Sequence, residues 1–224
     1  GVQLCVIRGS APMTIGLACS VRSCFSIHVS KGEETRAAVL DRAVQVARRV
    51  GLSGLTIGTL AEQTEMSKSG LFAHFSSKEE LQVEMLRQAA EHFEQVVWGP
   101  ALRAPRGGPR IRKLFETWLA WAGDPASPGG CIFTAAGAEL DDREGRPRDF
   151  LVDNQNRLHD AIARSAKIAI DVGHFRPDLD PQGFGFELYG ILLAYNHYLR
   201  LLRDPEAASR AQVAFERLLA AARA

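Results

Sequence analysis

The sequence predicts an all-α protein of about nine helices, arranged as a small N-terminal unit of three helices followed by a larger helical unit. Three observations support this class. Apolar residues repeat at spacings of three and four along most of the 224 residues. Capping residues and glycine or proline breaks separate these periodic stretches. Strict alternation of apolar and polar residues, which would indicate strands, is scarce.

The capping residues and the breaks predict where each helix begins and ends. Gly51 is placed to end the first helix in a left-handed turn. Thr56 and Ser67 are natural N-caps for the second and third helices, and Ser77 and Glu80 have the spacing of a full capping box that opens the fourth. The predicted helices are 32–50, 57–63, 68–75, 78–98, 111–121, 131–140, 147–172, 181–202 and 205–222.

The breaks between the later helices are equally marked. The Gly/Pro/Arg-rich stretch 99–109 predicts a loop or weakly ordered linker after the fourth helix. Polar residues predict a turn at 141–147, and 173–180 predicts a loop. Asp204 is expected to cap the last helix, with Pro205 at its first position.

The composition is that of an ordinary globular protein, with 46% hydrophobic residues, 24% charged residues and a formal net charge of +1. The four cysteines lack metal-ligand spacing, so the sequence predicts neither a zinc site nor a disulfide framework, and it is compatible with the reducing cytoplasm. No apolar run is long enough to span a bilayer. We expect residues 1–29 to form a leader, either disordered or an extension upstream of the true start.

The stretch 55–81 carries the most information about function. Two short helices joined by a tight turn are the smallest unit that places one helix in a DNA major groove. If Leu71 and Phe75 face the core, small residues face outward and let the backbone approach base edges. The outward positions are then Ser69, Gly70 and Ala73, with Phe72 and His74 on the flanks. Lys68 is placed to reach a guanine edge or a phosphate, and Thr56 and Lys78 lie at helix N-termini, which favour phosphate.

A longer array of motifs surrounds these residues: Lys31-Gly-Glu-Glu-Thr-Arg36, Val39-Leu-Asp-Arg-Ala43, Leu55-Thr-Ile, Leu60-Ala, Met66-Ser-Lys-Ser-Gly-Leu-Phe-Ala-His-Phe75 and Ser77-Lys-Glu-Glu-Leu81. This array resembles the N-terminal domain of TetR-family regulators. The resemblance implies a helix-turn-helix DNA-binding domain over 30–78 and a larger ligand-binding and dimerisation domain over 79–224. It implies base-facing roles for Lys68, Ser69, Gly70 and Ala73, and DNA-backbone contacts for Thr56, Phe72, His74 and Lys78.

Two positions depart from the family pattern. The family usually has tyrosine where Phe72 stands, so a contact from Phe72 must be apolar. The family usually has glycine where Glu65 stands, and a non-glycine residue with positive φ there costs about 1 kcal/mol. The alternative interpretations are a solvated charge for Lys68 or Lys78 and a capping or surface role for His74.

The larger unit resembles the family's regulatory half through the segment Gly130-Cys-Ile-Phe and Ala138-Glu139. Large residues on its helices are candidates for a pocket that binds an apolar or aromatic ligand, although plain core packing is the alternative for each of them. The ligand candidates are Phe93, Trp118, Trp121, Phe133, Phe186 and Tyr189. Apolar residues of the last two helices exceed what one buried stripe needs, which predicts a two-fold dimer interface. The interface candidates are Leu188, Leu192, Tyr195, Leu199, Val213 and Leu218.

The sequence therefore predicts a cytoplasmic, ligand-responsive transcriptional regulator. By family resemblance it is a repressor that binds palindromic operator DNA as a homodimer and is released by a small apolar or aromatic effector. We expect no catalytic residues, no metal, no cofactor and no membrane partner. The alternatives are a helical-bundle enzyme and a protein-interaction module, each acting on an apolar small molecule.

Overall fold

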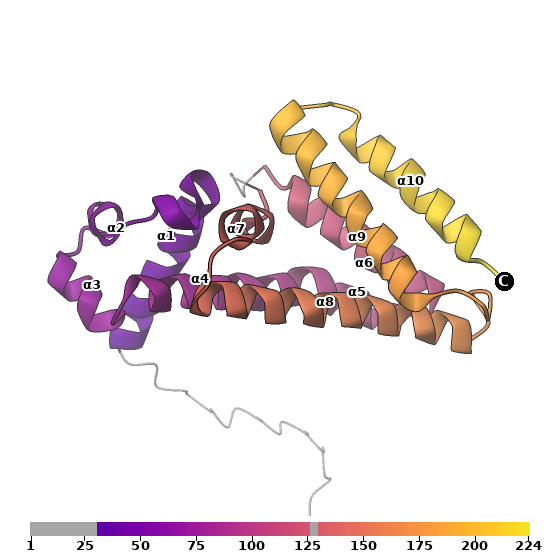
Figure 1. The fold of residues 1–224 in the computed structure, drawn as a ribbon, viewed down its shortest axis with the longest axis horizontal. Coiled ribbons are helices and arrows are strands. Elements are labelled where there is room, and N and C mark those ends of the chain that lie inside the picture. The colour runs from indigo at the N-terminus through magenta and orange to yellow at the C-terminus, as the bar shows by residue number, and fades with distance from the viewer. Residues whose placement is uncertain (1–30, 126–129) are drawn as a thin grey trace, which may run out of the picture.

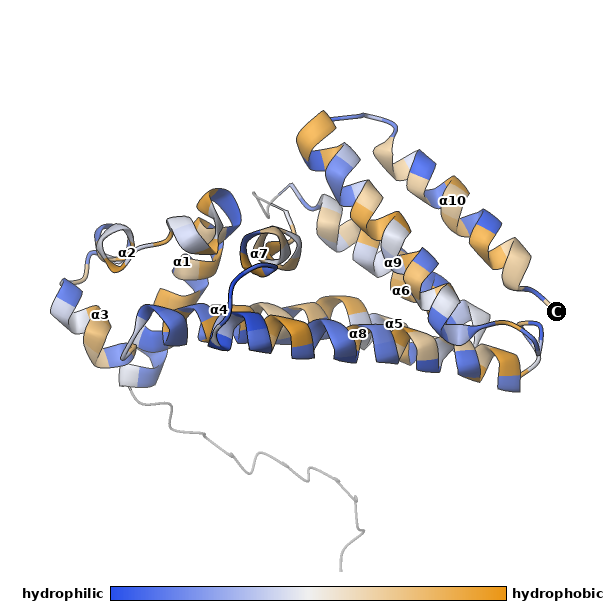
Figure 2. Cartoon of the chain, viewed as in Figure 1, coloured by the Kyte–Doolittle hydropathy of each residue, from blue (hydrophilic) through white to orange (hydrophobic). Residues whose placement is uncertain are grey.

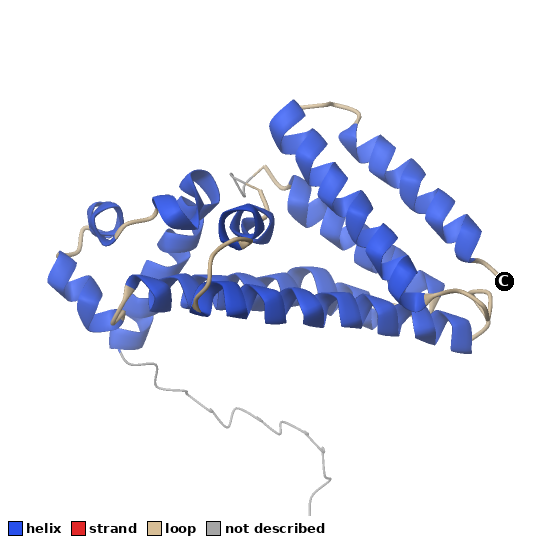
Figure 3. Ribbon diagram, in the orientation of Figure 1, coloured by secondary structure: helices blue, strands red, loops and turns tan. Residues whose placement is uncertain are grey.

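The computed structural model describes residues 31–125 and 130–224, in which every regular element is a helix (Figure 3). The predicted leader, residues 1–29, lies outside the described residues. The elements are α1 (Lys31–Gly54), α2 (Ile57–Thr64), α3 (Lys68–His74), α4 (Lys78–Phe93), the π-helical turn η1 (Glu94–Trp98), α5 (Gly99–Arg103), α6 (Gly108–Gly123), α7 (Ile132–Leu140), α8 (Arg146–Asp171), α9 (Pro181–His197), the π-helical turn η2 (Tyr198–Leu202) and α10 (Ala207–Ala222). Since α4, η1 and α5 are continuous, as are α9 and η2, the described residues form nine continuous helices, which confirms the predicted class.

The three N-terminal helices form a compact head at one end of the molecule (Figure 1). Their shared core contains Val39, Ala43, Leu60, Leu71 and Phe75, all buried. Because each helix alone buries one stripe only, the head depends on α4 to complete its core. The predicted domain boundary between residues 78 and 79 falls in the first turn of α4, and it stays a prediction.

The predicted linker 99–109 is wrong over its first half, because the fourth helix continues through α5 to Arg103. In a regular α-helix, the ring of Pro100 would clash with the carbonyl one turn earlier. The wider π-turn η1 directly precedes this proline and changes the hydrogen-bond register. Burial of Val97 and Ala101 against α6 then holds the extended helix together.

The larger unit is a bundle of long helices in which α8 lies along the α4–η1–α5 helix, and α9 and α10 pack as an antiparallel pair (Figure 1). Each long helix carries both apolar and polar residues along its length, as expected of amphipathic helices (Figure 2). The short helix α7 is seen end-on between the head and the bundle, and it packs against both α1 and α8. It therefore connects the two units.

Two predicted caps differ in detail. The Ser77 hydroxyl accepts the Glu80 N–H at 3.1 Å, but the Glu80 carboxylate accepts the N–H of Ser76, one residue earlier than a full capping box requires. The last helix begins at Ala207 rather than at Pro205. Asp204 instead closes the preceding turn, where its carboxylate accepts the Glu206 N–H at 2.9 Å.

Phe115 of α6 and Phe215 of α10 pack against each other in the core of the bundle. Both side chains are fully buried, and their rings stack with centroids 3.9 Å apart. We expect Phe215→Ala to lower the free energy of unfolding by about 3–5 kcal/mol, because it leaves a cavity and removes the stacked ring. Thermal or denaturant unfolding at fixed protein concentration measures this loss. The matched control is Phe72→Ala, whose side chain is 52% exposed, and equal destabilisation by the two variants would contradict the assignment.

Candidate DNA interface and ligand cavity

The helices α2 and α3 are joined by a turn of fixed geometry. Glu65 adopts the left-handed conformation, with φ 55° and ψ 26°, and the Met66 N–H donates to the Ala61 carbonyl at 3.1 Å. The strained position expected at Glu65 is therefore present. At the start of α3, the Ser67 hydroxyl accepts the Gly70 N–H at 3.0 Å, which fixes the direction of this short helix.

The two sides of α3 have opposite character. Leu71 and Phe75 are fully buried, as predicted. The ring of Phe75 also lies 5.0 Å from the Arg36 guanidinium, which ties α3 to α1. The solvent side carries the residues that the sequence places toward DNA. Lys68, Ser69, Phe72 and Ala73 are exposed, and Gly70 and His74 are half-buried.

Thr56 and Lys78 flank this surface at the starts of α2 and α4. The Thr56 hydroxyl accepts the Thr59 N–H at 3.0 Å, and the Thr59 hydroxyl accepts the Thr56 N–H at 3.0 Å, so Thr56 is a reciprocal cap. Lys78 Nζ donates to the Ser53 carbonyl at 3.0 Å. Both residues therefore have hydrogen-bond partners within the head, and their contacts to DNA phosphates stay a prediction.

The corner between α1 and α2 is held by α7. The Glu139 carboxylate accepts the N–H of Leu52 at 2.9 Å and the N–H of Ser53 at 2.6 Å. Gly51 adopts φ 79°, and a Cβ there would lie 2.1 Å from Glu139 Oε1, so only glycine allows this approach. From the other side, Gln82 Nε2 donates to the Leu52 carbonyl at 3.0 Å. The sequence predicted a positive φ at Gly51, but the residue forms a kink and α1 continues to Gly54. The sequence gave Glu139 no role, because its partners are 86 and 87 residues away.

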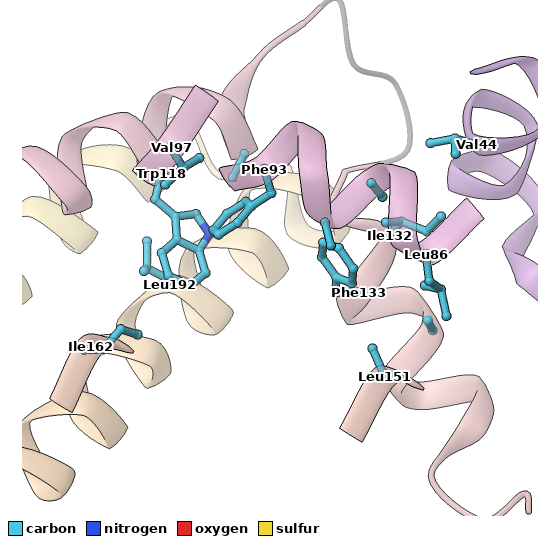
Figure 4. Close-up of a cluster of buried hydrophobic side chains, with 14 of the residues drawn as sticks. Val44, Leu86, Phe93, Val97, Trp118, Ile132, Phe133, Leu151, Ile162 and Leu192 are labelled. Carbon is cyan, nitrogen blue, oxygen red and sulfur yellow. The ribbon is translucent and has the colours of Figure 1, made fainter. Parts of the chain in front are cut away.

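A cavity of about 580 Å³ lies inside the larger unit, between the η1–α5 segment and α8. Residues of α6, α7 and α9 complete its lining. Figure 4 shows the rings of Phe93 and Trp118 meeting beside Leu192, and the two ring centroids are 4.9 Å apart at 76°. The volume suits a small organic molecule.

Four of the six predicted ligand residues line this cavity: Phe93, Trp118, Phe133 and Tyr189. Trp121 is not among the lining residues, and its ring packs against that of Phe93 with the centroids 5.0 Å apart. The prediction for Phe186 is wrong. Its side chain is 77% exposed and lies on the outer face of α9, since the helix turns Gly185 and Leu188 inward instead.

Several polar groups lie among the apolar side chains of the lining. The Tyr189 hydroxyl donates to Gln155 Oε1 at 3.0 Å, and burial raises the pKa of Tyr189 to about 12. Burial also raises the pKa of the Cys131 thiol, so both groups are neutral at pH 7. Sequence reasoning missed the three arginines of the lining, Arg110, Arg157 and Arg164. Their helical spacing on α8 could have indicated a shared face for two of them, but no cavity is visible in a sequence.

Most predicted dimer residues are wrong. Leu188, Leu192, Tyr195 and Leu218 are buried within the protomer, where they pack α9 and α10 against the bundle. Leu199 is half-buried, and Val213 is 50% exposed. The excess of apolar residues on these helices is real, but the exposed ones are Phe186, Leu193, Tyr198, Leu201, Leu202 and Val213.

The described residues contain no group of three or more His, Cys, Asp or Glu side chains arranged to hold a metal ion. None of their helices combines the length and the apolar character that crossing a membrane requires.

Two family models match the chain. The model of bacterial regulatory proteins of the tetR family matches residues 39–85, and the model of the tetracyclin repressor-like C-terminal domain matches residues 107–215. A search of curated proteins found no match.

Solved structures share the fold. A TetR-family regulator from Cytophaga hutchinsonii aligns with a TM-score of 0.77 at 18% identity, covering 87% of this chain and 98% of its own. A TetR regulator from Chloroflexus aurantiacus J-10-FL aligns with a TM-score of 0.72 at 24% identity, and the alignment covers 85% of this chain and 94% of that regulator. AibR, solved in complex with isovaleryl coenzyme A and operator DNA, aligns with a TM-score of 0.66 at 21% identity, and the alignment covers 82% of this chain and 96% of AibR.

The two family models together match more than half of the chain, one over the helix-turn-helix and the other over the cavity-bearing bundle. The chain therefore belongs to the TetR family of bacterial transcriptional regulators.

Proposed function

We propose that this regulator is a homodimeric repressor rather than an enzyme, and that an effector bound in the cavity releases it from palindromic operator DNA in the cytoplasm. The observation that carries the proposal is the α2–turn–α3 unit, in which the solvent side of α3 exposes Lys68, Ser69 and Ala73 and carries no carboxylate. AibR, which shares the fold, was solved with both operator DNA and a coenzyme A thioester, so this architecture accommodates both partners in one protein.

The reading surface is the solvent side of α3. Ser69, Gly70 and Ala73 keep the backbone accessible, so the helix can lie deep in a major groove. Lys68 supplies a cation at its N-terminal end, and no hydrogen bond or ion pair within the described residues occupies it. Phe72 offers an apolar contact to a thymine methyl group or a sugar. Thr56, His74 and Lys78 flank this surface and would meet phosphates.

The dimer surface is the outer face of α9, η2 and α10. Phe186, Gly190 and Ala194 follow one another at spacings of four residues, Leu201 lies seven residues beyond Ala194, and all four are exposed. Nothing lies within 4 Å of a Cβ built at Gly190, so a second helix could approach closely there. Val213 of α10 extends the surface. A two-fold mate would bury this stripe in a four-helix bundle and set the spacing of the two α3 helices.

The route from cavity to DNA is α7. Phe133 and Thr134, in its first turn, line the cavity, and Glu139, in its last turn, holds the corner of the head. A rigid nine-residue helix moves as one body, so an effector that displaces its first turn also displaces Glu139. An effector that prefers the displaced form lowers DNA affinity by its differential affinity for the two forms.

We expect Lys68→Ala to weaken binding to the preferred duplex by about tenfold, because one contact to a base or phosphate is lost. The duplex is first selected from a random pool, and we expect a palindrome whose half-sites lie about 34 Å apart. Fluorescence anisotropy at several salt concentrations then measures the affinity. Lys113→Ala, on an exposed face of α6, is the control and should leave binding unchanged. If Lys68→Ala binds like the parent protein, the DNA surface is wrongly assigned.

We expect Leu201→Arg to produce a monomer, because two-fold symmetry brings two buried like charges together in the proposed interface. Light scattering after gel filtration should give the mass of one chain instead of two. The matched control is Val152→Arg on α8, a 40% exposed position outside this surface. A stable dimer of the Leu201 variant would rule out this face.

We expect Glu139→Gln to loosen the α1–α2 corner by about 1–3 kcal/mol, because a carboxamide has one acceptor oxygen for two backbone donors. Hydrogen exchange at the amides of Leu52 and Ser53 should accelerate, and duplex affinity should fall. Glu144→Gln, an exposed carboxylate in the turn after α7, serves as the control. Unchanged exchange at both amides would show that Glu139 does not hold the corner.

A further inference from the structure

Resting on the proposed function, we infer that the effector is an organic anion with an apolar body, and that Arg157 and Arg164 of α8 bind its anionic group. The proposal assigns a chemical class to the cavity occupant and a recognition site at the cavity's α8 wall. Carboxylates and phosphates share the required chemistry.

The apolar body is accommodated by the cavity interior. Aromatic side chains from four helical segments surround it, namely Phe93, Trp98, Trp118, Phe133 and Tyr189. Leu158, Ile168 and Leu192 add aliphatic surface. The Tyr189 hydroxyl already donates a hydrogen bond to Gln155, so its proton needs no acceptor from a ligand. An alkyl or aryl group of moderate length would bury most of its surface here.

The anion site lies on one face of α8. Arg157, Ala161 and Arg164 line the cavity in succession at spacings of four and three residues. The two arginine Cα atoms are thus about two helical turns, or roughly 10 Å, apart along the axis. The small side chain of Ala161 leaves room between them. Two flexible guanidinium groups can therefore converge on one anionic group, or bind two neighbouring ones.

These two arginines differ from the other cations of α8. Lys167 pairs with Asp171, and Arg148 donates to the Asp141 carbonyl at 3.3 Å. Within the described residues, Arg157 and Arg164 have neither a hydrogen bond nor an ion pair. Arg157 and Arg164 therefore have donors available to a ligand, and both line the cavity.

The charge balance of the lining also favours an anion. Arg110 is a third lining guanidinium, and its Nη2 donates to the carbonyls of Leu102 and Ala104 at 3.2 Å each, so no carboxylate neutralises it. Glu94 supplies the one carboxylate among the described lining residues. Cys131 and Tyr189 remain neutral at pH 7, as shown above. Three guanidinium groups against one carboxylate give the lining an excess of positive charge, which attracts an anion.

The test compares octanoate with octanamide, which has the same shape without the charge, on the intact regulator. Tryptophan fluorescence reports binding, because Trp98 and Trp118 line the cavity. We expect octanoate to bind at least about tenfold more tightly than octanamide. The double variant Arg157→Gln with Arg164→Gln should lose this difference and leave octanamide binding unchanged. Lys167→Gln, on the same helix but off the cavity wall, is the matched control and should behave like the parent protein.

Octanoyl-coenzyme A and coenzyme A form separate arms that distinguish the source of the anion. Arginine-dependent binding of octanoate identifies a carboxylate, and arginine-dependent binding of octanoyl-coenzyme A alone identifies a phosphate; either result supports the proposal. The proposal is overturned if neither octanoate nor octanoyl-coenzyme A loses affinity in the double variant. The same samples are tested for duplex binding. Absence of anion binding with duplex binding intact rejects this inference alone, whereas absence of duplex binding in the parent protein rejects the proposed function.

Discussion

One carboxylate joins the two halves of this protein. Glu139 lies in the last turn of α7, and it accepts two consecutive backbone N–H groups at the corner where α1 ends and α2 begins. Both donors follow the kink at Gly51, and their bonds to Glu139 are partly buried, so losing this acceptor would be costly. Gly51 makes the approach sterically possible. The direction in which α2 and α3 leave the body of the protein is therefore set by a residue of the regulatory half.

The same helix explains how a cavity can influence a distant surface. The first turn of α7 belongs to the cavity wall and its last turn to the head, and α4 touches both units as well. Gln82 and Lys78 of α4 bind the carbonyls of Leu52 and Ser53, so the corner is held from both sides. A segment fixed by two helices from the sensing unit responds to relative movement of those helices. Coupling of this kind needs no contact between effector and DNA.

The cavity itself depends on irregular helix geometry. The π-turn η1 forms part of the wall opposite α8, just before Pro100, and the helix continues beyond it as α5. Wider turns of this type recur at functional sites, because they change which side chains face inward without ending the helix. Here, Glu94, Trp98 and Leu102 reach the cavity from successive turns.

Local sequence determined the elements, the turns and the faces of the head. The caps at Thr56 and Ser67 and the inward pair Leu71 and Phe75 follow from short-range chemistry, and the structure has each of them. The left-handed Glu65 was expected from the family pattern, and Gly51, expected to end the first helix, instead forms a kink with positive φ three residues before its end. The motif array also identified the family. Four cavity residues were predictable because large aromatic side chains on amphipathic helices usually face the interior.

Tertiary structure decided what local patterns cannot specify. Phe186 and Leu188 look alike as apolar residues of one helix, but only packing against α8 and α10 shows that Phe186 faces outward and Leu188 inward. The pairing of Glu139 with the α1–α2 corner and the presence of Arg157 and Arg164 on a cavity wall arise from contacts between distant segments. Helical periodicity fixes which residues share a face, whereas the neighbour that covers each face is chosen by the packing of the whole chain.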